Sequence, residues 1–197
     1  SKRSCGKTVR FTDTELPIEE ATPELFNEVD IVFISANGTV SKNLAPIAVR
    51  QGALVIDDSS IFRMDSQVPL VVPEINPEDL EHHRGIIAIP NCSTTPLAMV
   101  LKPLNDVNPI QRVIVDTYQS VSGTGAAAMD ELRVQSGQVL DDSQIAPKEY
   151  PHQIAFNLLP HCDDFFDDGY TKEEWKMQQE SRKILGQPDL AFSATCV

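Results

Sequence analysis

The sequence predicts an α/β fold, in which helices cover the faces of a mostly parallel sheet. The first observation is a set of short apolar segments at residues 30–35 (DIVFIS), 53–57 (ALVID) and 85–90 (GIIAIP). Continuous apolar runs of this length are typical of strands buried on both faces, as parallel strands are. The second observation is that segments with helix signals separate these runs, which is the order of strand–helix–strand units.

The helix signals of the first half stand next to those strands. Residues 22–29 begin with a Thr as N-cap and a Pro at the first helical position, which favours a helix start. Residues 42–52 form a second helical segment that ends on a Gly, and residues 75–83 repeat the pattern of an Asn cap followed by Pro. A short strand is predicted ahead of all of them, at residues 7–11.

The second half has a different character, and we expect a domain boundary near residue 91. The predicted domains are residues 1–91 and 92–197. The second half contains a helix directly after Cys92, an alternating strand, an Ala-rich helix, an irregular segment, a helix with a Thr171–Glu174 capping box and a last strand. The alternating strand is predicted at residues 112–119, the Ala-rich helix at 125–140 and the irregular segment at 143–153. The helix with the capping box is predicted at 171–186 and the last strand at 190–197.

Composition excludes several classes of function. Sixteen basic against 29 acidic residues give a net charge of −13, so a nucleic-acid partner is not expected. No apolar run approaches the roughly 20 residues that cross a bilayer, and no signal peptide is recognisable. The four cysteines are scattered without metal-binding spacing, so we expect no metal, reduced thiols and a cytoplasmic protein.

Cys92 lies in an unusual place, in a polar turn just ahead of a helix (IPNCSTTPLAMV). Ser93, Thr94 or Thr95 can cap that helix, and Pro96 suits its first turn. Unpaired backbone N–H groups and the helix dipole would then favour the thiolate and make Cys92 a nucleophile. A small core residue in a turn is the alternative, and position alone favours it.

The segments around this cysteine resemble aspartate-β-semialdehyde dehydrogenases. The resemblance rests on PNCSTTP, DDSSIFRMDSQVPLVVPEIN, YQSVSGTGAAAMDEL, QIAFNLLPH, GYTKEEWKM and SATCV, in the family's order over essentially the whole chain. It implies part of a Rossmann-type NADP-binding domain. It also implies part of an α+β catalytic and dimerisation domain of the glyceraldehyde-phosphate-dehydrogenase-like kind.

The same resemblance implies a reaction and its residues. NADPH reduces aspartyl phosphate to aspartate semialdehyde and phosphate through a thioester on Cys92, in lysine, threonine and methionine biosynthesis. Gln119 would hold the reacting group, and Arg63 would bind phosphate with a guanidinium suited to bidentate contacts. Without the resemblance, a polar residue at a strand end and a surface Arg would be the simpler interpretations.

Further substrate and cofactor residues follow from the resemblance. Glu173 would meet the substrate ammonium and Lys176 the phosphate, although a Glu–Lys pair at this spacing is also a routine surface pair. Asn91 would contact the substrate or the nicotinamide. Three groups of residues are implied for NADP. Arg3 and Ser4 would reach the 2′-phosphate, and Ser122 and Gly123 would form a loop near the nicotinamide. The turn after a buried strand would line the cofactor groove with Ser35, Ala36, Asn37 and Gly38.

The segment GTGAAA (residues 123–128) fits a dinucleotide fingerprint, but the strand before it alternates and it follows Cys92, so we reject that interpretation. The family's glycine-rich loop and its later Arg and His are not in the sequence. We therefore expect an internal piece of a longer, homo-oligomeric enzyme (dimer or tetramer), with little activity alone. The alternatives are a related phosphorylating dehydrogenase, a Cys–His hydrolase, and a noncatalytic fragment or relative that acts in binding or assembly.

Overall fold

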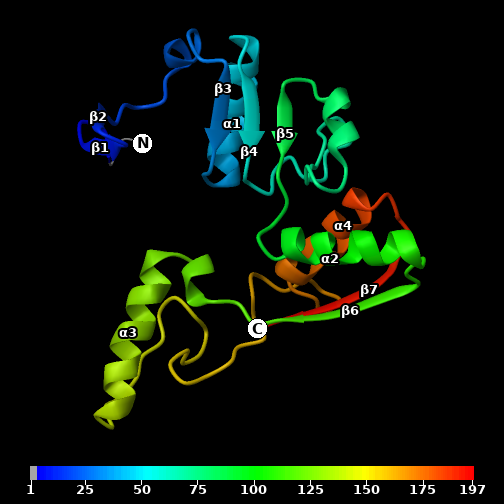
Figure 1. Cartoon of the computed structure of the whole chain (residues 1–197). Coiled ribbons are helices and arrows are strands. Elements are labelled where there is room, and N and C mark those ends of the chain that lie inside the picture. The colour runs from blue at the N-terminus through cyan, green and yellow to red at the C-terminus, as the bar shows by residue number, and fades with distance from the viewer. Residues whose placement is uncertain (1–3) are drawn as a thin grey trace. The chain divides into compact units, whose positions relative to one another are not determined.

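The computed structural model describes residues 4–197 (Figure 1). The chain separates into two compact units, Ser1–Pro90 and Asn91–Val197. The predicted NADP-binding residue Arg3 lies outside the described residues. Among the described helices, none combines the length and apolar character that crossing a membrane requires.

The first unit is built on a parallel three-stranded sheet in the order β3-β4-β5. The strands are β3 (Ile31–Ile34), β4 (Leu54–Asp57) and β5 (Ile86–Ala88), and α1 (Gly38–Arg50) connects the first two. Two fully buried alanines of α1, Ala45 and Ala48, let the helix pack closely on the sheet. The core of this unit consists of Phe26, Ile34, Ala45, Ala48, Ala53 and Val55. The predicted parallel strands and intervening helix are therefore confirmed.

The edge strand β3 differs from the prediction, because it is not buried on both faces. Ile31 and Phe33 are exposed, Phe33 by 75%, whereas Ile34 is buried. Both side chains are thus left accessible by the part of this unit that the structure describes. The connecting helix also starts earlier than predicted, because the Asn37 side chain accepts the N–H of Val40 at 3.0 Å and caps it.

Two predicted helices are only short 3₁₀ turns, η1 (Pro23–Phe26) and η2 (Pro77–His82). The Thr22 side chain makes no capping hydrogen bond. The Asn76 side chain instead accepts the N–H of Val72 and donates to the carbonyl of Leu70, both at 2.9 Å. Asn76 therefore holds the turn before η2, and no cap is left to extend an α-helix.

An antiparallel hairpin precedes the sheet and is separate from it. It pairs β1 (Thr8–Phe11) with β2 (Thr14–Pro17), and all eight residues are exposed. The first strand was predicted, but the second was missed. The turn between them uses Thr12 at a φ of 52°, so it carries none of the Gly or Asn signals by which hairpins are recognised.

The second unit centres on two parallel strands, β6 (Arg112–Thr117) and β7 (Ala191–Cys196), paired from Arg112↔Ala191 to Thr117↔Cys196. The helices α2 (Thr94–Val107) and α4 (Lys172–Ile184) lie beside this pair (Figure 1). The core between helices and strands consists of Leu101, Val113, Met177, Leu190, Phe192, Ala194 and Cys196. The predicted capping box of α4 is present, with Thr171 and Glu174 bonded reciprocally.

The third helix of this unit, α3 (Ala126–Leu140), follows the 3₁₀ turn η3 (Val121–Gly123), and irregular chain runs back along it (Figure 1). Gly125, at the N-cap of α3, has a φ of +118°, which favours glycine. Both the Ala-rich helix and the irregular segment after it are as predicted. The α/β fold class with parallel strands is thus confirmed.

Candidate functional site

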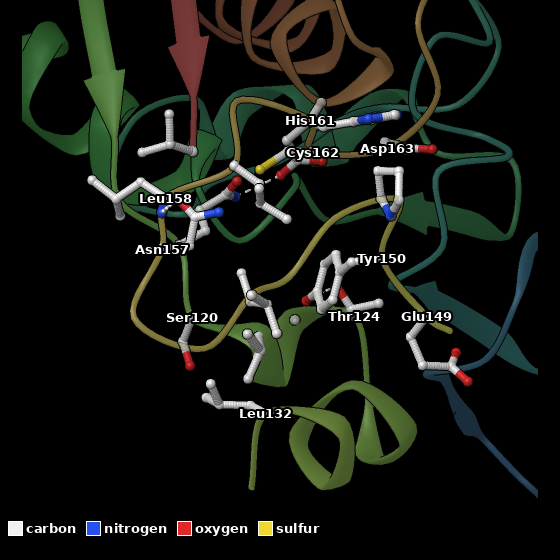
Figure 2. A pocket seen from close by; sticks show the side chains of 18 of the residues that line it. Ser120, Thr124, Leu132, Glu149, Tyr150, Asn157, Leu158, His161, Cys162 and Asp163 are labelled. Atoms are coloured by element: carbon white, nitrogen blue, oxygen red, sulfur yellow. Dashed lines mark hydrogen bonds between the residues drawn. The ribbon is translucent and has the colours of Figure 1, made fainter. Parts of the chain in front are cut away.

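A pocket of approximately 1170 Å³ opens in the second unit (Figure 2). Its wall draws on the turn before α2, the segment after β6, η3, α3, α4 and the irregular segment between α3 and α4. Six residues singled out from the sequence line it: Asn91, Cys92, Gln119, Gly123, Glu173 and Lys176.

Cys92 is exposed in the turn just before α2. The expected cap of that helix is wrong, because Ser93 stands at the N-cap but makes no capping hydrogen bond with its side chain. The cap comes from Asn91, whose Oδ1 accepts the N–H of Ser93 at 2.8 Å. The Asn91 carbonyl also accepts the N–H of Thr95 at 3.1 Å. The residue before the cysteine therefore organises the helix start.

Gln119, two residues beyond the end of β6, links three segments. Its backbone N–H donates to the Val197 carbonyl at 2.7 Å. Its Nε2 donates to Ser93 Oγ at 2.7 Å and to Glu173 Oε1 at 2.9 Å. The side-chain amide is thus held between the Cys92 turn and α4.

Glu173 is the centre of the polar contacts in the pocket. Besides Gln119, its carboxylate accepts Asn91 Nδ2 at 3.2 Å and Lys176 Nζ at 3.3 Å. Its side chain is 11% exposed. The sequence predicted four separate site residues, and the structure joins them in one hydrogen-bonded network: Asn91, Gln119, Glu173 and Lys176.

Lys176 has a second partner, Asp163, which the sequence analysis did not single out. Lys176 Nζ donates to Asp163 Oδ2 at 2.7 Å. Burial acts to lower the pKa of Lys176, but hydrogen bonding to Asp163 and the charges of Glu173 and Asp163 outweigh it and raise that pKa. Burial acts to raise the pKa of Asp163, and the contacts with Lys176 and the Asp164 N–H lower it overall. Both groups are therefore charged at neutral pH.

A second cysteine, Cys162, lines the same pocket. Burial raises the pKa of its thiol, and the neighbouring carboxylates of Glu173, Glu174 and Asp163 raise it further. Buried Cys196 has its pKa raised to about 11, mainly by burial. Neither thiol is therefore suited to act as a nucleophile at neutral pH.

The irregular wall of the pocket is held by buried polar side chains of α3. Gln135 Oε1 accepts the N–H groups of Ile154 and Ala155 at 2.9 and 3.2 Å, and Gln135 Nε2 donates to Glu131 Oε1 at 2.7 Å. Glu131 in turn accepts the backbone N–H groups of residues 148 and 149. These contacts give a chain segment without secondary structure a defined position.

Glu180 is a further residue that sequence reasoning missed. It is 1% exposed, and its Oε2 accepts the backbone N–H of Asn91 at 2.7 Å. A signal was present, because Glu180 falls in the buried stripe of α4 that also contains Met177 and Ile184. An acid at a position where the helical period requires an apolar residue indicates a specific partner.

The remaining predicted residues belong to the first unit or lie beside the pocket. Arg63 is buried, and its guanidinium donates to the carbonyls of Ile89 (2.9 Å) and Asp58 (2.7 Å). Ser4 precedes the hairpin, and the exposed turn that contains Ser35, Ala36 and Asn37 and leads into Gly38 follows β3. Ser122 lies in η3, where its hydroxyl hydrogen-bonds Ser120 Oγ at 3.2 Å.

The fold and the site define a two-unit α/β protein, in which a parallel α/β unit is followed by a unit that presents an exposed cysteine just before a helix. The family model described as "Semialdehyde dehydrogenase, NAD binding domain" matches residues 1–83, and "Semialdehyde dehydrogenase, dimerisation domain" matches residues 101–197. The chain belongs to the semialdehyde dehydrogenase family, among the aspartate-semialdehyde dehydrogenases.

Relatives of that name are similar over the whole chain. The Bacillus subtilis protein is 50% identical over 100% of this chain, and the Aquifex aeolicus protein is 49% identical over the same share. The crystal structure of aspartate semialdehyde dehydrogenase II from Vibrio cholerae matches with a TM-score of 0.94 and 44% identity, over 100% of this chain and 59% of its own. The chain likewise spans 59% of the length of the two relatives. The resemblance drawn from the sequence motifs is confirmed.

Proposed function

We propose that the protein carrying this chain is an NADP-dependent aspartate-semialdehyde dehydrogenase. It would reduce aspartyl phosphate to aspartate semialdehyde and phosphate, a step of lysine, threonine and methionine biosynthesis. The observation that carries the proposal is the exposed Cys92, in one pocket with Gln119, Glu173 and Lys176. The related V. cholerae enzyme has been crystallised with aspartate semialdehyde.

Cys92 supplies covalent catalysis in this proposal. Its thiolate Sγ attacks the acyl carbon, a C–S bond forms, and the C–O bond to phosphate breaks with its electron pair leaving on phosphate. After reduction of the thioester, the thiohemiacetal oxygen loses its proton, the C–S bond breaks, and the thiolate is regenerated as the aldehyde leaves. A thiolate suits both steps, because it is a strong nucleophile and a good leaving group.

The neighbouring side chains bind and orient the substrate. Glu173 offers a carboxylate to the ammonium group, and Lys176 offers an ammonium to the phosphate. Gln119 is held beside the Cys92 turn through Ser93 Oγ, so its amide can position the acyl group. Orientation of this kind accounts for a large part of the acceleration when the reacting atoms are held at near contact.

The pocket is acidic, which suits a substrate that carries an ammonium group. Its lining has four carboxylates (Glu149, Asp163, Asp164 and Glu173) against the single cation of Lys176. Phosphate binding therefore needs further positive charge. We assign part of it to Arg63, as the family resemblance implies. The Arg63 guanidinium donates to two backbone carbonyls and also lies 4.0 Å from Asp58 Oδ1.

The turn after β3 fits a nucleotide cofactor. Ser35, Ala36 and Asn37 are exposed at the carboxyl end of a parallel strand, which is where dinucleotides bind in such sheets. NADPH, when bound, supplies the hydride. Its holders would be this turn, Arg3 and Ser4 at the 2′-phosphate, and Ser122 and Gly123 near the nicotinamide. A relative from Candida albicans, 26% identical with a TM-score of 0.71, was crystallised with NADP.

Residues 1–91 and 92–197 would thus serve as the NADP-binding and catalytic parts. We also propose a cytoplasmic homo-oligomer, a dimer or tetramer. Ile114 on β6 and Tyr118, one residue beyond its end, support this, since they are 72% and 79% exposed. Large exposed apolar groups are typical of association surfaces. Sedimentation of the full-length protein would test the assembly, and a monomer at micromolar concentration would refute it.

The decisive test is turnover by the full-length protein. We expect NADP reduction that requires both aspartate semialdehyde and phosphate, and the reverse reaction with aspartyl phosphate and NADPH. Activity with glyceraldehyde phosphate or acetylglutamyl phosphate instead, or hydrolysis without cofactor, would refute the proposal. The 197-residue chain alone should give little or no turnover, and full activity from it would overturn that expectation.

A further inference from the structure

Glu180 places a carboxyl group in the buried stripe of α4. It is 1% exposed, and burying a carboxylate is costly unless strong hydrogen bonds compensate for it. The stripe it shares with Met177 and Ile184 faces the interior. An apolar residue there would complete the core, so the acid needs a reason beyond packing.

One contact of Glu180 reaches the residue next to the nucleophile. Its Oε2 accepts the backbone N–H of Asn91 at 2.7 Å, although the two residues are 89 positions apart. This length is typical of a charge-assisted hydrogen bond. A backbone N–H bonded to a carboxylate on a rigid helix has a fixed position and direction.

The rest of Asn91 is fixed as well. Its carbonyl accepts the Thr95 N–H, its Oδ1 accepts the Ser93 N–H, and its Nδ2 donates to Glu173. All four of its polar groups are therefore engaged. Ser93, on the other side of Cys92, is held through its N–H and through the bond from Gln119 to its hydroxyl.

We propose that Glu180 is a positioning residue for Cys92, acting through the backbone N–H of Asn91. The carboxylate fixes the turn at 91–93, and the turn aims the thiol into the pocket. Glu180 itself stays buried. The inference rests on the proposed function of Cys92 as nucleophile and adds a residue that determines its geometry.

This role depends on where the side chain places its acceptor oxygen, and not on its charge alone. Two conservative variants separate the position of the oxygen from the charge. Glu180→Gln keeps an acceptor oxygen at the same reach and removes the charge. Glu180→Asp keeps the charge but withdraws the acceptor by one methylene, about 1.5 Å. We expect the Gln variant to keep kcat within about threefold and the Asp variant to lose about tenfold or more, the range of one hydrogen bond to a charged group.

The test uses the full-length protein with three readouts: kcat and KM, the rate at which iodoacetamide modifies Cys92 as measured by peptide mass spectrometry, and thermal stability. For Glu180→Asp, kcat and the Cys92 alkylation rate should both fall, while KM for the substrate changes less than about threefold. A mispositioned nucleophile affects the chemical step more than substrate binding.

A matched control lies on the same helix. Arg182 donates to the Leu190 carbonyl at 3.0 and 2.8 Å, so Arg182→Ala also removes contacts between α4 and another segment, but away from residues 91–93. It should reduce thermal stability without slowing Cys92 alkylation. If Glu180→Asp behaves like this control, or if the Gln variant is the more impaired of the two, the positioning role is wrong.

The readouts also separate this inference from the proposed function. A wild-type protein without dehydrogenase turnover would refute the function. The alkylation rates of the two Glu180 variants would still decide whether Glu180 positions the thiol.

Discussion

The ion pair between Asp163 and Lys176 offers a direct test of phosphate binding. Lys176 Nζ donates to Asp163 at 2.7 Å and to Glu173 at 3.3 Å. A phosphate bound by Lys176 has to compete with these carboxylates. We therefore expect Asp163→Asn to strengthen phosphate binding, because the ammonium loses its closer competitor and remains oriented by Glu173.

The magnitude follows from the burial of the pair. The side chains of Lys176 and Asp163 are 19% and 33% exposed. Surface pairs contribute about 0.2–1 kcal/mol, whereas breaking a buried pair costs about 3–5 kcal/mol. A value between them of about 1.4 kcal/mol corresponds to a tenfold change in an equilibrium constant, so the KM for phosphate should fall about tenfold. Lys176 stays charged in the variant, since Glu173 also raises its pKa.

The assay is NADP reduction by the full-length protein at varied phosphate and saturating aspartate semialdehyde. Asp164→Asn is the matched control, because Asp164 is the next residue and pairs at 2.7 Å with Lys172 instead. Its KM for phosphate should stay within about twofold, as expected for an exposed pair. An unchanged or higher KM in Asp163→Asn would show that Asp163 orients Lys176 and does not compete with phosphate.

Three further outcomes are expected. Cys92→Ser should abolish turnover by at least about a thousandfold and leave the melting temperature unchanged, because Cys92 is exposed; an active variant would refute the nucleophile. Gln135→Ala should lower the free energy of unfolding by about 2–3 kcal/mol in urea titration, because it leaves backbone N–H groups of the pocket wall unsatisfied. The pKa of Asp163 is lowered in the folded protein, so its stabilisation is present above the ordinary pKa of 3.8 and is lost as pH falls through the folded-state value. The free energy of unfolding, measured below pH 5, should therefore decline less steeply with acidification in Asp163→Asn than in the wild type.

The sequence predicted the elements whose signals are local. Apolar runs located β3, β4 and β5, and the Thr171–Glu174 spacing located the start of α4. The 3₁₀ turns were mistaken for helices because an Asn or Thr before Pro predicts a cap only if its side chain is free to make one. The side chain of Asn76 is committed to the preceding turn.

The site was predictable to a different extent. Motifs named Cys92, Gln119 and Lys176, which line one pocket. No motif could name Asp163, because its role depends on a contact across 13 residues of sequence. The helical period marks Glu180 as a buried acid, but it cannot name the partner Asn91, which lies 89 residues away. Local spacing says which residues share a helix face but not what a distant segment brings to that face.

The start of α4 shows how adjacent acids come to have separate roles. Glu174 accepts the N–H groups of Thr171 at 2.7 Å and Cys196 at 3.0 Å, and so joins the helix to β7. Glu173, rotated by about 100° around the helix, accepts Gln119, Asn91 and Lys176. Because Glu174 fixes the helix to the sheet, Glu173 and Glu180 can hold the Cys92 turn from a rigid support. A helix that was free to shift would move both carboxylates together, and the thiol would lose its position even with every site residue intact.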